Sequence, residues 1–126
     1  MERFLPGRHQ IESFGNGGFR LGGVSHQGSI LITPSGVRAF AADDVASLKT
    51  EHFETLVSEK SNIDMLLIGT GREMVPLAKP ISQHLLQHAL GFEIMSTNAA
   101  VRIYNVVQAE DRRVAAILFA VDKAYG

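Results

Sequence analysis

Short apolar segments alternate with helical patterns from Asp64 onward, and this alternation limits the possible folds more than any other feature of the sequence. The pattern predicts strands at 64–68, 92–95 and 114–121 and helices at about 81–90 and 98–110. The last strand contains no polar residue, which favours a central position in a sheet. Apolar strands that alternate with helices are typical of a partly parallel sheet buried on both faces. The fold class is therefore α/β.

The first third of the chain has the pattern of an antiparallel meander. Segments 11–14 and 19–21 flank the turn residues 15–18, Gly-Asn-Gly-Gly, so a hairpin is expected there. Segments 29–33 and 37–40 are separated by Pro-Ser-Gly, which predicts a second antiparallel pair.

Several residues are expected to mark helix ends. Thr50 is placed to act as the N-cap of a helix at 51–58, because its hydroxyl can accept from a free backbone N–H. Gly91 is a suitable residue to end the helix at 81–90, and Ser96 or Thr97 can cap the helix that follows.

Length and composition indicate one globular domain over residues 1–126. The chain is 45% hydrophobic and carries a formal net charge of −1, so it lacks the basic surface that nucleic-acid binding requires. Cysteine is absent, which excludes disulfides and thiol nucleophiles. The sequence shows no secretory signal pattern and no run of about 20 apolar residues. We therefore expect a soluble, cytoplasmic protein that does not span a membrane.

The segment 63–71 is an apolar strand that ends in Gly69-Thr70-Gly71. Small residues between a strand and a helix let a ligand approach backbone N–H groups, and Arg72 could add charge for a phosphate or carboxylate. The lysine of a phosphate-binding P-loop is missing, and two prolines separate the loop from the next helix. Both an anion site and a purely structural turn therefore remain open.

Other chemical motifs are incomplete. His84 and His88 have the spacing of a metal-binding pair, but no third ligand is evident and no metal is expected. Arg20 stands where a dinucleotide fingerprint needs its third glycine, so no cofactor is expected. No nucleophile elbow accompanies Ser25 and His26. We assign no catalytic residue, and enzymatic activity stays open with a non-enzymatic role favoured.

The helix at 98–110 combines a polar and an apolar side. At 100° per residue, the polar arc consists of Asn98, Arg102, Asn105 and Gln108. The opposite side is expected to pack on the sheet and consists of Ala99, Ala100, Ile103, Tyr104, Val106 and Val107.

Glu110 falls near the apolar side of this helix, so its carboxylate must be paired or lie beyond the last turn. Arg112 and Arg113 are the nearest partners in sequence. A structural ion pair at this corner, with Arg112 as the preferred partner, is favoured over a catalytic carboxylate.

Several sequence pieces together resemble a known family. The matching pieces lie at 17–19, 28–32, 66–71, 95–100, 102, 104–105 and 110–116. The most specific are Met-Ser-Thr-Asn-Ala-Ala at 95–100 and Glu-Asp-Arg-Arg-Val-Ala-Ala at 110–116. The chain resembles the family of uncharacterised domains that includes mitochondrial respiratory complex I assembly factor 3 and adipogenesis-associated domain proteins.

The resemblance implies a three-layer fold. Its central mixed sheet would have about five strands with helices on its faces, and a β-hairpin layer would be added at the N-terminus. The family offers no established catalytic residues to transfer. The polar positions that match its motif are Thr97, Arg102, Asn105, Glu110 and Arg112, together with Gly69 and Gly71.

Two functions follow as hypotheses. The first is a non-enzymatic protein-assembly or interaction module that contacts an unidentified protein through the cleft beside residues 69–71 and the polar arc. The alternative is a small-molecule or anion-binding protein, or an enzyme, that takes a phosphate- or carboxylate-bearing ligand at that loop. The candidate ligand-binding residues are Gly69, Thr70, Gly71, Arg72, Thr97, Arg102 and Asn105.

Overall fold

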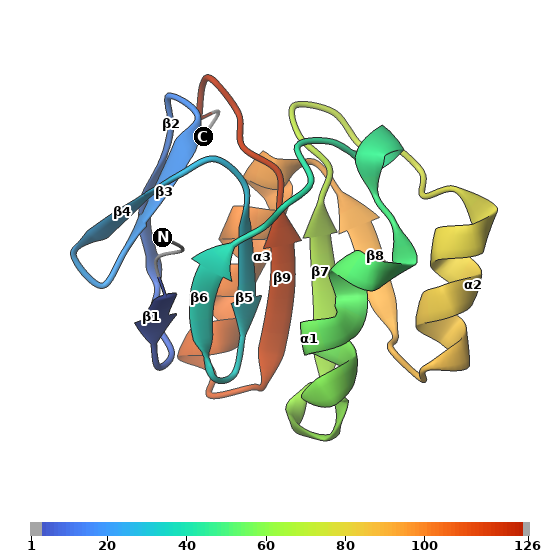
Figure 1. The fold of residues 1–126 in the computed structure, drawn as a ribbon. Helices are drawn as coiled ribbons and strands as arrows, with labels where there is room; N and C mark the ends of the chain where they lie inside the picture. The colour runs from blue at the N-terminus through green and yellow to red at the C-terminus, as the bar shows by residue number, and fades with distance from the viewer. Residues whose placement is uncertain (1–3, 125–126) are drawn as a thin grey trace.

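A six-stranded mixed sheet forms the centre of the molecule in the computed structural model, which describes residues 4–124 (Figure 1). The strands follow the order β1 (Phe4–Pro6), β6 (Gly36–Ala39), β5 (Ile30–Thr33), β9 (Val114–Leu118), β7 (Met65–Gly69) and β8 (Phe92–Met95). Strand β9 lies between antiparallel β5 and parallel β7, and β8 continues the parallel part. The α/β class and the central position of the last strand are confirmed, and the sheet has six strands where about five were expected.

A separate three-stranded antiparallel sheet forms the additional β layer. It consists of β2 (Ile11–Gly15), β3 (Gly18–Leu21) and β4 (Val24–Gln27). The expected hairpin joins β2 to β3 through Asn16 and Gly17, whose φ angles of 52° and 76° are both left-handed. Two left-handed residues give the turn that matches the twist of paired strands, which explains this sequence.

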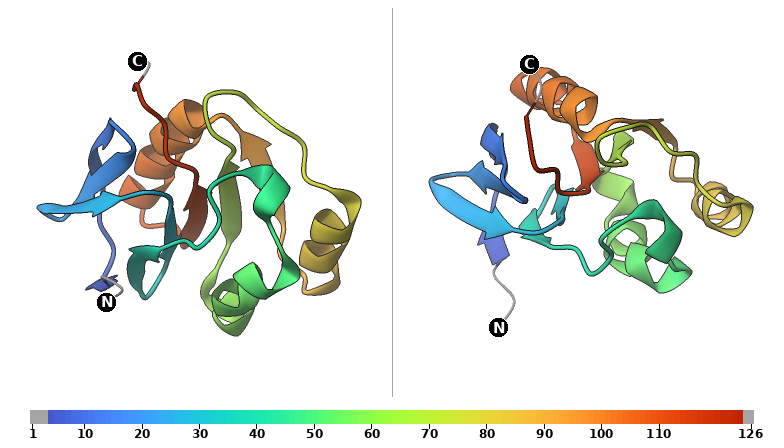
Figure 2. Two further views of the ribbon diagram at one scale, coloured as in Figure 1. Left: turned by 45° about the horizontal axis from the view of Figure 1, so that its top comes forward. Right: turned by 90° about the horizontal axis from the view of Figure 1, so that it is seen from above.

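The two faces of the large sheet are covered by different elements (Figure 2). Helix α3 (Thr97–Ala109) and the small sheet pack on one face, where they share a core with Leu67, Ala116 and Leu118. Helices α1 (Glu54–Ser58) and α2 (Lys79–Gln87) cover the other face, over Leu66 and Ile117. Successive residues of β7 and β9 therefore enter opposite cores, as strand geometry requires. Both central strands are buried on both sides, in agreement with their apolar sequences.

Short 3-10 turns connect β6 to α1 and α1 to β7. They are η1 (Val45–Ser47), η2 (Thr50–Phe53) and η3 (Lys60–Asn62). Thr50 is the first residue of η2 and does not cap it, so the expectation for Thr50 was wrong. The turn begins one residue earlier because the N–H of His52 bonds to the carbonyl of Lys49, while the His52 ring accepts from the Lys49 N–H.

Helix α2 ends at Gln87, and the left-handed residue that terminates it is Ala89 and not Gly91. Ala89 has a φ of 58°, and its N–H donates to the carbonyl of Leu86 while that of Leu90 donates to Leu85. These are the two hydrogen bonds of a Schellman motif, which usually places glycine at the left-handed position. Leu85 and Leu90 are both buried in the same core and hold the chain in this conformation. Tertiary packing has overridden the local preference for glycine.

Candidate functional site

The glycine loop after β7 lies directly beneath the start of α3. A Cβ atom placed on Gly69 would lie 2.9 Å from the Cα of Thr97 and 3.0 Å from the Cβ of Ala100. These distances are too short for any side chain, so glycine is what allows α3 to approach the sheet here. The carbonyl of Gly69 accepts from the N–H of Phe119 at 2.9 Å, which ties the loop to the end of β9.

The hydroxyl of Thr70 is used within the loop itself. It donates to the carbonyl of Glu73 at 2.7 Å and accepts from the N–H of Val75 at 2.9 Å. The N–H of Thr70 donates to the carbonyl of Met95 at 2.8 Å. Thr70 is only 7% exposed, and these bonds hold the chain in its turn away from β7.

Thr97 joins the loop to both neighbouring elements. Its Oγ1 donates to the carbonyl of Phe119 at 2.7 Å and accepts from the N–H of Gly71 at 2.9 Å. Its own N–H donates to the carbonyl of Gly71 at 2.8 Å, and the side chain is completely buried. Gly69, Thr70, Gly71 and Thr97 are therefore brought together, and they bond to one another and to adjacent backbone. A ligand at this loop stays a prediction.

Arg72 lies at the edge of the same loop and borders a pocket of about 410 Å³. The other lining residues come from the segment that follows β9, and they are Ala120, Val121, Asp122 and Lys123. The pocket lies beyond the carboxyl end of a central strand, where open α/β sheets commonly bind ligands.

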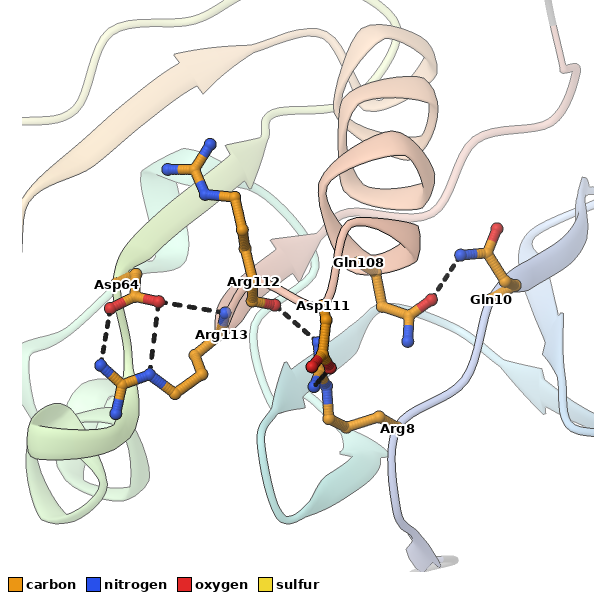
Figure 3. Close-up of polar contacts among 7 residues, drawn as sticks. All are labelled: Arg8, Gln10, Asp64, Gln108, Asp111, Arg112 and Arg113. Carbon is orange, nitrogen blue, oxygen red and sulfur yellow. Dashed lines mark hydrogen bonds and ion pairs between the residues drawn. The ribbon is translucent and has the colours of Figure 1, made fainter.

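Two members of the polar arc of α3, Asn105 and Gln108, face the N-terminal segment 8–11, which we term the N-terminal strap. Of the other two, Asn98 is buried near the start of the helix and Arg102 is exposed. The Asn105 side-chain amide bonds to both backbone groups of Ile11: Oδ1 accepts from its N–H at 2.8 Å and Nδ2 donates to its carbonyl at 3.0 Å. Gln10 donates to the backbone carbonyl of Asn105 at 3.0 Å. It also donates to the Gln108 side chain, as Figure 3 shows. Asn105 thus supplies the hydrogen bonds that a neighbouring strand would otherwise give.

Two further contacts hold the strap. The Tyr104 hydroxyl, on a side chain that is 1% exposed, donates to the carbonyl of His9 at 2.8 Å. Arg8 donates to the carboxylate of Asp111 at 2.8 Å and to the carbonyl of Arg112 at 2.6 Å (Figure 3). Sequence reasoning missed Arg8 and Gln10 as partners of α3 and the corner that follows it, and it missed Tyr104 as a partner of His9, because about a hundred residues separate the strap from α3.

The corner between α3 and β9 is held by ion pairs of Asp111 and Arg113 (Figure 3). These are the sequence neighbours of Glu110 and Arg112, the pair proposed from sequence. Glu110 is the exposed residue just beyond α3, so it lies outside the last turn. Asp111 has a φ of 60° and pairs with Arg8 at 2.8 Å, while Asp64 pairs with Arg113 at 2.8 Å. Hydrogen bonds from the side chain and backbone of Arg113 hold the pKa of Asp64 below its usual range. Arg112 was proposed from sequence as the partner of Glu110. In the structure, its backbone carbonyl accepts a hydrogen bond from Arg8.

The outer side of α3 carries apolar residues that the sequence projection placed against the sheet. Ile103 is 37% exposed and Val106 is 60% exposed, so their expected burial was wrong. The apolar residues of α3 that are buried in the core form a narrower stripe, which consists of Ala100, Val101, Tyr104 and Val107. We define the α3 outer face as Arg102, Ile103, Val106, Ala109 and Glu110, all of which are exposed.

His84 and His88 lie on successive turns at the end of α2, with ring centroids 4.6 Å apart. Both are half-buried and line a pocket of about 380 Å³ with Glu51 and Glu54 from η2 and α1. Within residues 4–124, no group of three or more histidine or carboxylate side chains is arranged to hold a metal ion.

Asn105→Ala should release the N-terminal strap, because it leaves the N–H and the carbonyl of Ile11 without their partners. Water can reach this half-buried site, so we expect a loss of about 1–2 kcal/mol in the free energy of unfolding, measured with urea. The amide of Ile11 should also exchange faster with deuterium. Val106→Ala, on the exposed side of the same helix, should change stability by less than about 0.5 kcal/mol. Unchanged protection of the Ile11 amide would contradict the role given to Asn105.

The mixed sheet, with helices on both faces and a second small sheet, defines a layered α/β domain. The chain belongs to the DUF498/DUF598 family of proteins of unknown function, whose model matches residues 11–119. An uncharacterised protein of Rhodobacter capsulatus is 33% identical over 95% of this chain and 91% of its own length. The crystal structure of a protein from Bartonella henselae, described as an outer membrane protein, superposes with a TM-score of 0.87. It is 43% identical over 94% of this chain and 99% of that one.

The family resemblance expected from sequence is confirmed by a third relative. NADH dehydrogenase [ubiquinone] 1 alpha subcomplex assembly factor 3 of Drosophila melanogaster is 26% identical over 86% of this chain. The match spans 57% of the length of the Drosophila protein. Every helix within residues 4–124 is too short or too polar to cross a lipid bilayer.

Proposed function

We propose that this protein is a protein-interaction module that takes part in the assembly of a protein complex and binds its partner through the α3 outer face. The observation that carries the proposal is the exposure of two branched apolar side chains, Ile103 and Val106, on successive turns of a well-anchored helix. Helices that bind partners commonly present apolar residues at this spacing.

The helix is rigid enough to present such a surface. The Ser96 side chain caps its first turn by accepting from the N–H of Ala99, and four residues of the buried stripe fix its other side in the core. The apolar centre of the outer face is bordered by a positive charge at Arg102 and a negative charge at Glu110. An apolar centre with a polar rim is the usual anatomy of a protein interface.

The Drosophila relative supports the assembly role, because it is named as an assembly factor. Its low identity and greater length make this support a matter of analogy. We further propose a cytoplasmic location. Recovery of the native protein in the soluble fraction of lysed cells would agree with it, and recovery with the membranes after a high-salt wash would contradict it.

The test is affinity capture from a native extract with the tagged full chain and two matched variants. Val106→Glu places a charge in the α3 outer face, whereas Leu86→Glu places one on α2 at a side chain that is 65% exposed. We expect a co-purifying protein to be retained by the parent chain and by Leu86→Glu and to be lost with Val106→Glu. Circular dichroism should show equal melting temperatures for the two variants. Retention by Val106→Glu, or no retained protein with the parent chain, would overturn the proposal.

A second candidate function is anion binding in the pocket beside the glycine loop. Arg72 and Lys123 line this pocket together with one carboxylate residue, Asp122, and the excess of cationic side chains favours this reading. A thermal-shift series with inorganic phosphate, citrate and nucleotides tests it. One of these anions should raise the melting temperature of the parent chain, and Lys123→Ala should reduce the shift. Equal shifts for both proteins, or none, would exclude this function.

A further inference from the structure

We propose that the α3 outer face binds a second copy of this chain, by antiparallel pairing of two α3 helices about a two-fold axis at Val106. The inference rests on the proposed function, because it uses the same surface and names the partner. It makes the protein a symmetric dimer whose interface is the same patch on both copies.

The order of residues along α3 makes the outer face complementary to itself. Arg102 and Glu110 lie four residues to either side of Val106, about 6 Å along the helix axis in each direction. A two-fold axis at Val106 therefore brings Arg102 of one copy level with Glu110 of the other, and the symmetry repeats this contact. Two pairs of opposite charges then flank one apolar centre.

The apolar residues fit the same arrangement. Val106 meets Val106 at the axis, and Ile103 of each copy lies level with Ala109 of the other. On a helical projection these two positions lie on opposite sides of Val106, so they flank the central contact, and the small Ala109 leaves room for the two helices to approach. Val106 is also the more exposed of the two branched side chains, at 60%, so the centre of the pairing coincides with the largest apolar exposure on the helix.

Charge also selects the direction of pairing. In a parallel pair in register, Arg102 would face Arg102 and Glu110 would face Glu110, which places like charges together. The antiparallel pair replaces both repulsions with attractions. Because α3 has 13 residues, the contact is small, and we expect a dissociation constant on the order of 10–100 µM.

Sedimentation equilibrium of the purified full chain tests the proposal over a concentration range that spans micromolar to millimolar. The parent chain should dimerise, and Arg102→Glu and Glu110→Arg should each weaken dimerisation at least tenfold, since each variant alone places like charges together. An equimolar mixture of the two variants should dimerise as well as the parent chain, because both contacts become complementary again. Recovery in the mixture also shows that neither variant had merely misfolded.

The result separates this inference from the proposed function. A parent chain that stays monomeric at all concentrations would overturn the inference, as would a dimer that neither charge reversal affects. If the chain is monomeric and Val106→Glu still loses a protein from the extract, the proposed function stands and the inference alone fails. If the chain dimerises as described and captures no other protein, the inference stands and a role in assembling other proteins fails.

Discussion

Replacing Thr97 by valine should destabilise the protein by about 2–4 kcal/mol, although the two side chains have nearly the same shape. The Thr97 hydroxyl donates to the carbonyl of Phe119 and accepts from the N–H of Gly71. Valine fills the same space but leaves both backbone groups without a partner in a site where Thr97 is 0% exposed. Each unpaired buried group costs about 1–3 kcal/mol. The melting temperature should fall on the order of 10 °C.

Thr97→Ser is the matched control for this substitution. Serine keeps both hydrogen bonds and loses one methyl group, which should cost about 1 kcal/mol. Chemical unfolding of the three proteins measures the difference. If valine costs no more than serine, the hydroxyl does not hold the loop, α3 and β9 together as described.

The central sheet could be predicted because its signals are local. Each central strand is a short apolar run, and the alternation with helices indicates parallel neighbours. The β2–β3 hairpin was equally predictable from sequence, because Asn-Gly, here Asn16-Gly17, is a dipeptide that two-residue hairpin turns strongly prefer. The resemblance supplied the additional layer, which appears in the structure as a three-stranded sheet.

The roles of the α3 side chains could not be predicted, because they depend on distant parts of the chain. A helical projection divides polar from apolar residues, but it does not show how wide a stripe the sheet covers. Ile103 and Val106 are therefore exposed, although they are apolar. The same projection identified Asn105 without showing that its partner is Ile11, more than ninety residues earlier.

The glycine loop shows a related limit. Gly69-Thr70-Gly71 has the composition of an anion-binding turn, and it was expected at the end of a central strand, where the structure places it. Its hydrogen bonds involve Thr97, which in turn bonds to Phe119, and both residues come from other parts of the chain. The glycines indicated a backbone that other groups can approach closely. The tertiary contacts determined that the start of α3 is the group that approaches it.

Raising the pH from 10 to 12 should remove about 2 kcal/mol of stability through Tyr104 alone. Burial raises the pKa of Tyr104 to about 12, against an opposing effect of the Arg8 charge, and the ordinary value is 10.0. Between these values the unfolded chain loses the phenolic proton while the folded chain keeps it. The unfolded state then binds fewer protons, so stability falls as the pH rises. Below pH 10 the contribution is complete, and the hydroxyl keeps its hydrogen bond to His9.

The chain contains two tyrosines, so Tyr125→Phe leaves Tyr104 as the single titrating phenol. In this variant, the near-ultraviolet absorbance of tyrosinate should develop around pH 12 in the folded protein and around pH 10 in denaturant. Tyr104→Phe has no phenolic proton at this site, so its unfolding free energy should fall less than that of the parent chain over the same range. Because lysine and arginine titration affects both proteins alike, the difference between them isolates Tyr104. A folded-state midpoint near pH 10 would show that the phenol is open to water, and hence that the strap does not seal this side of α3.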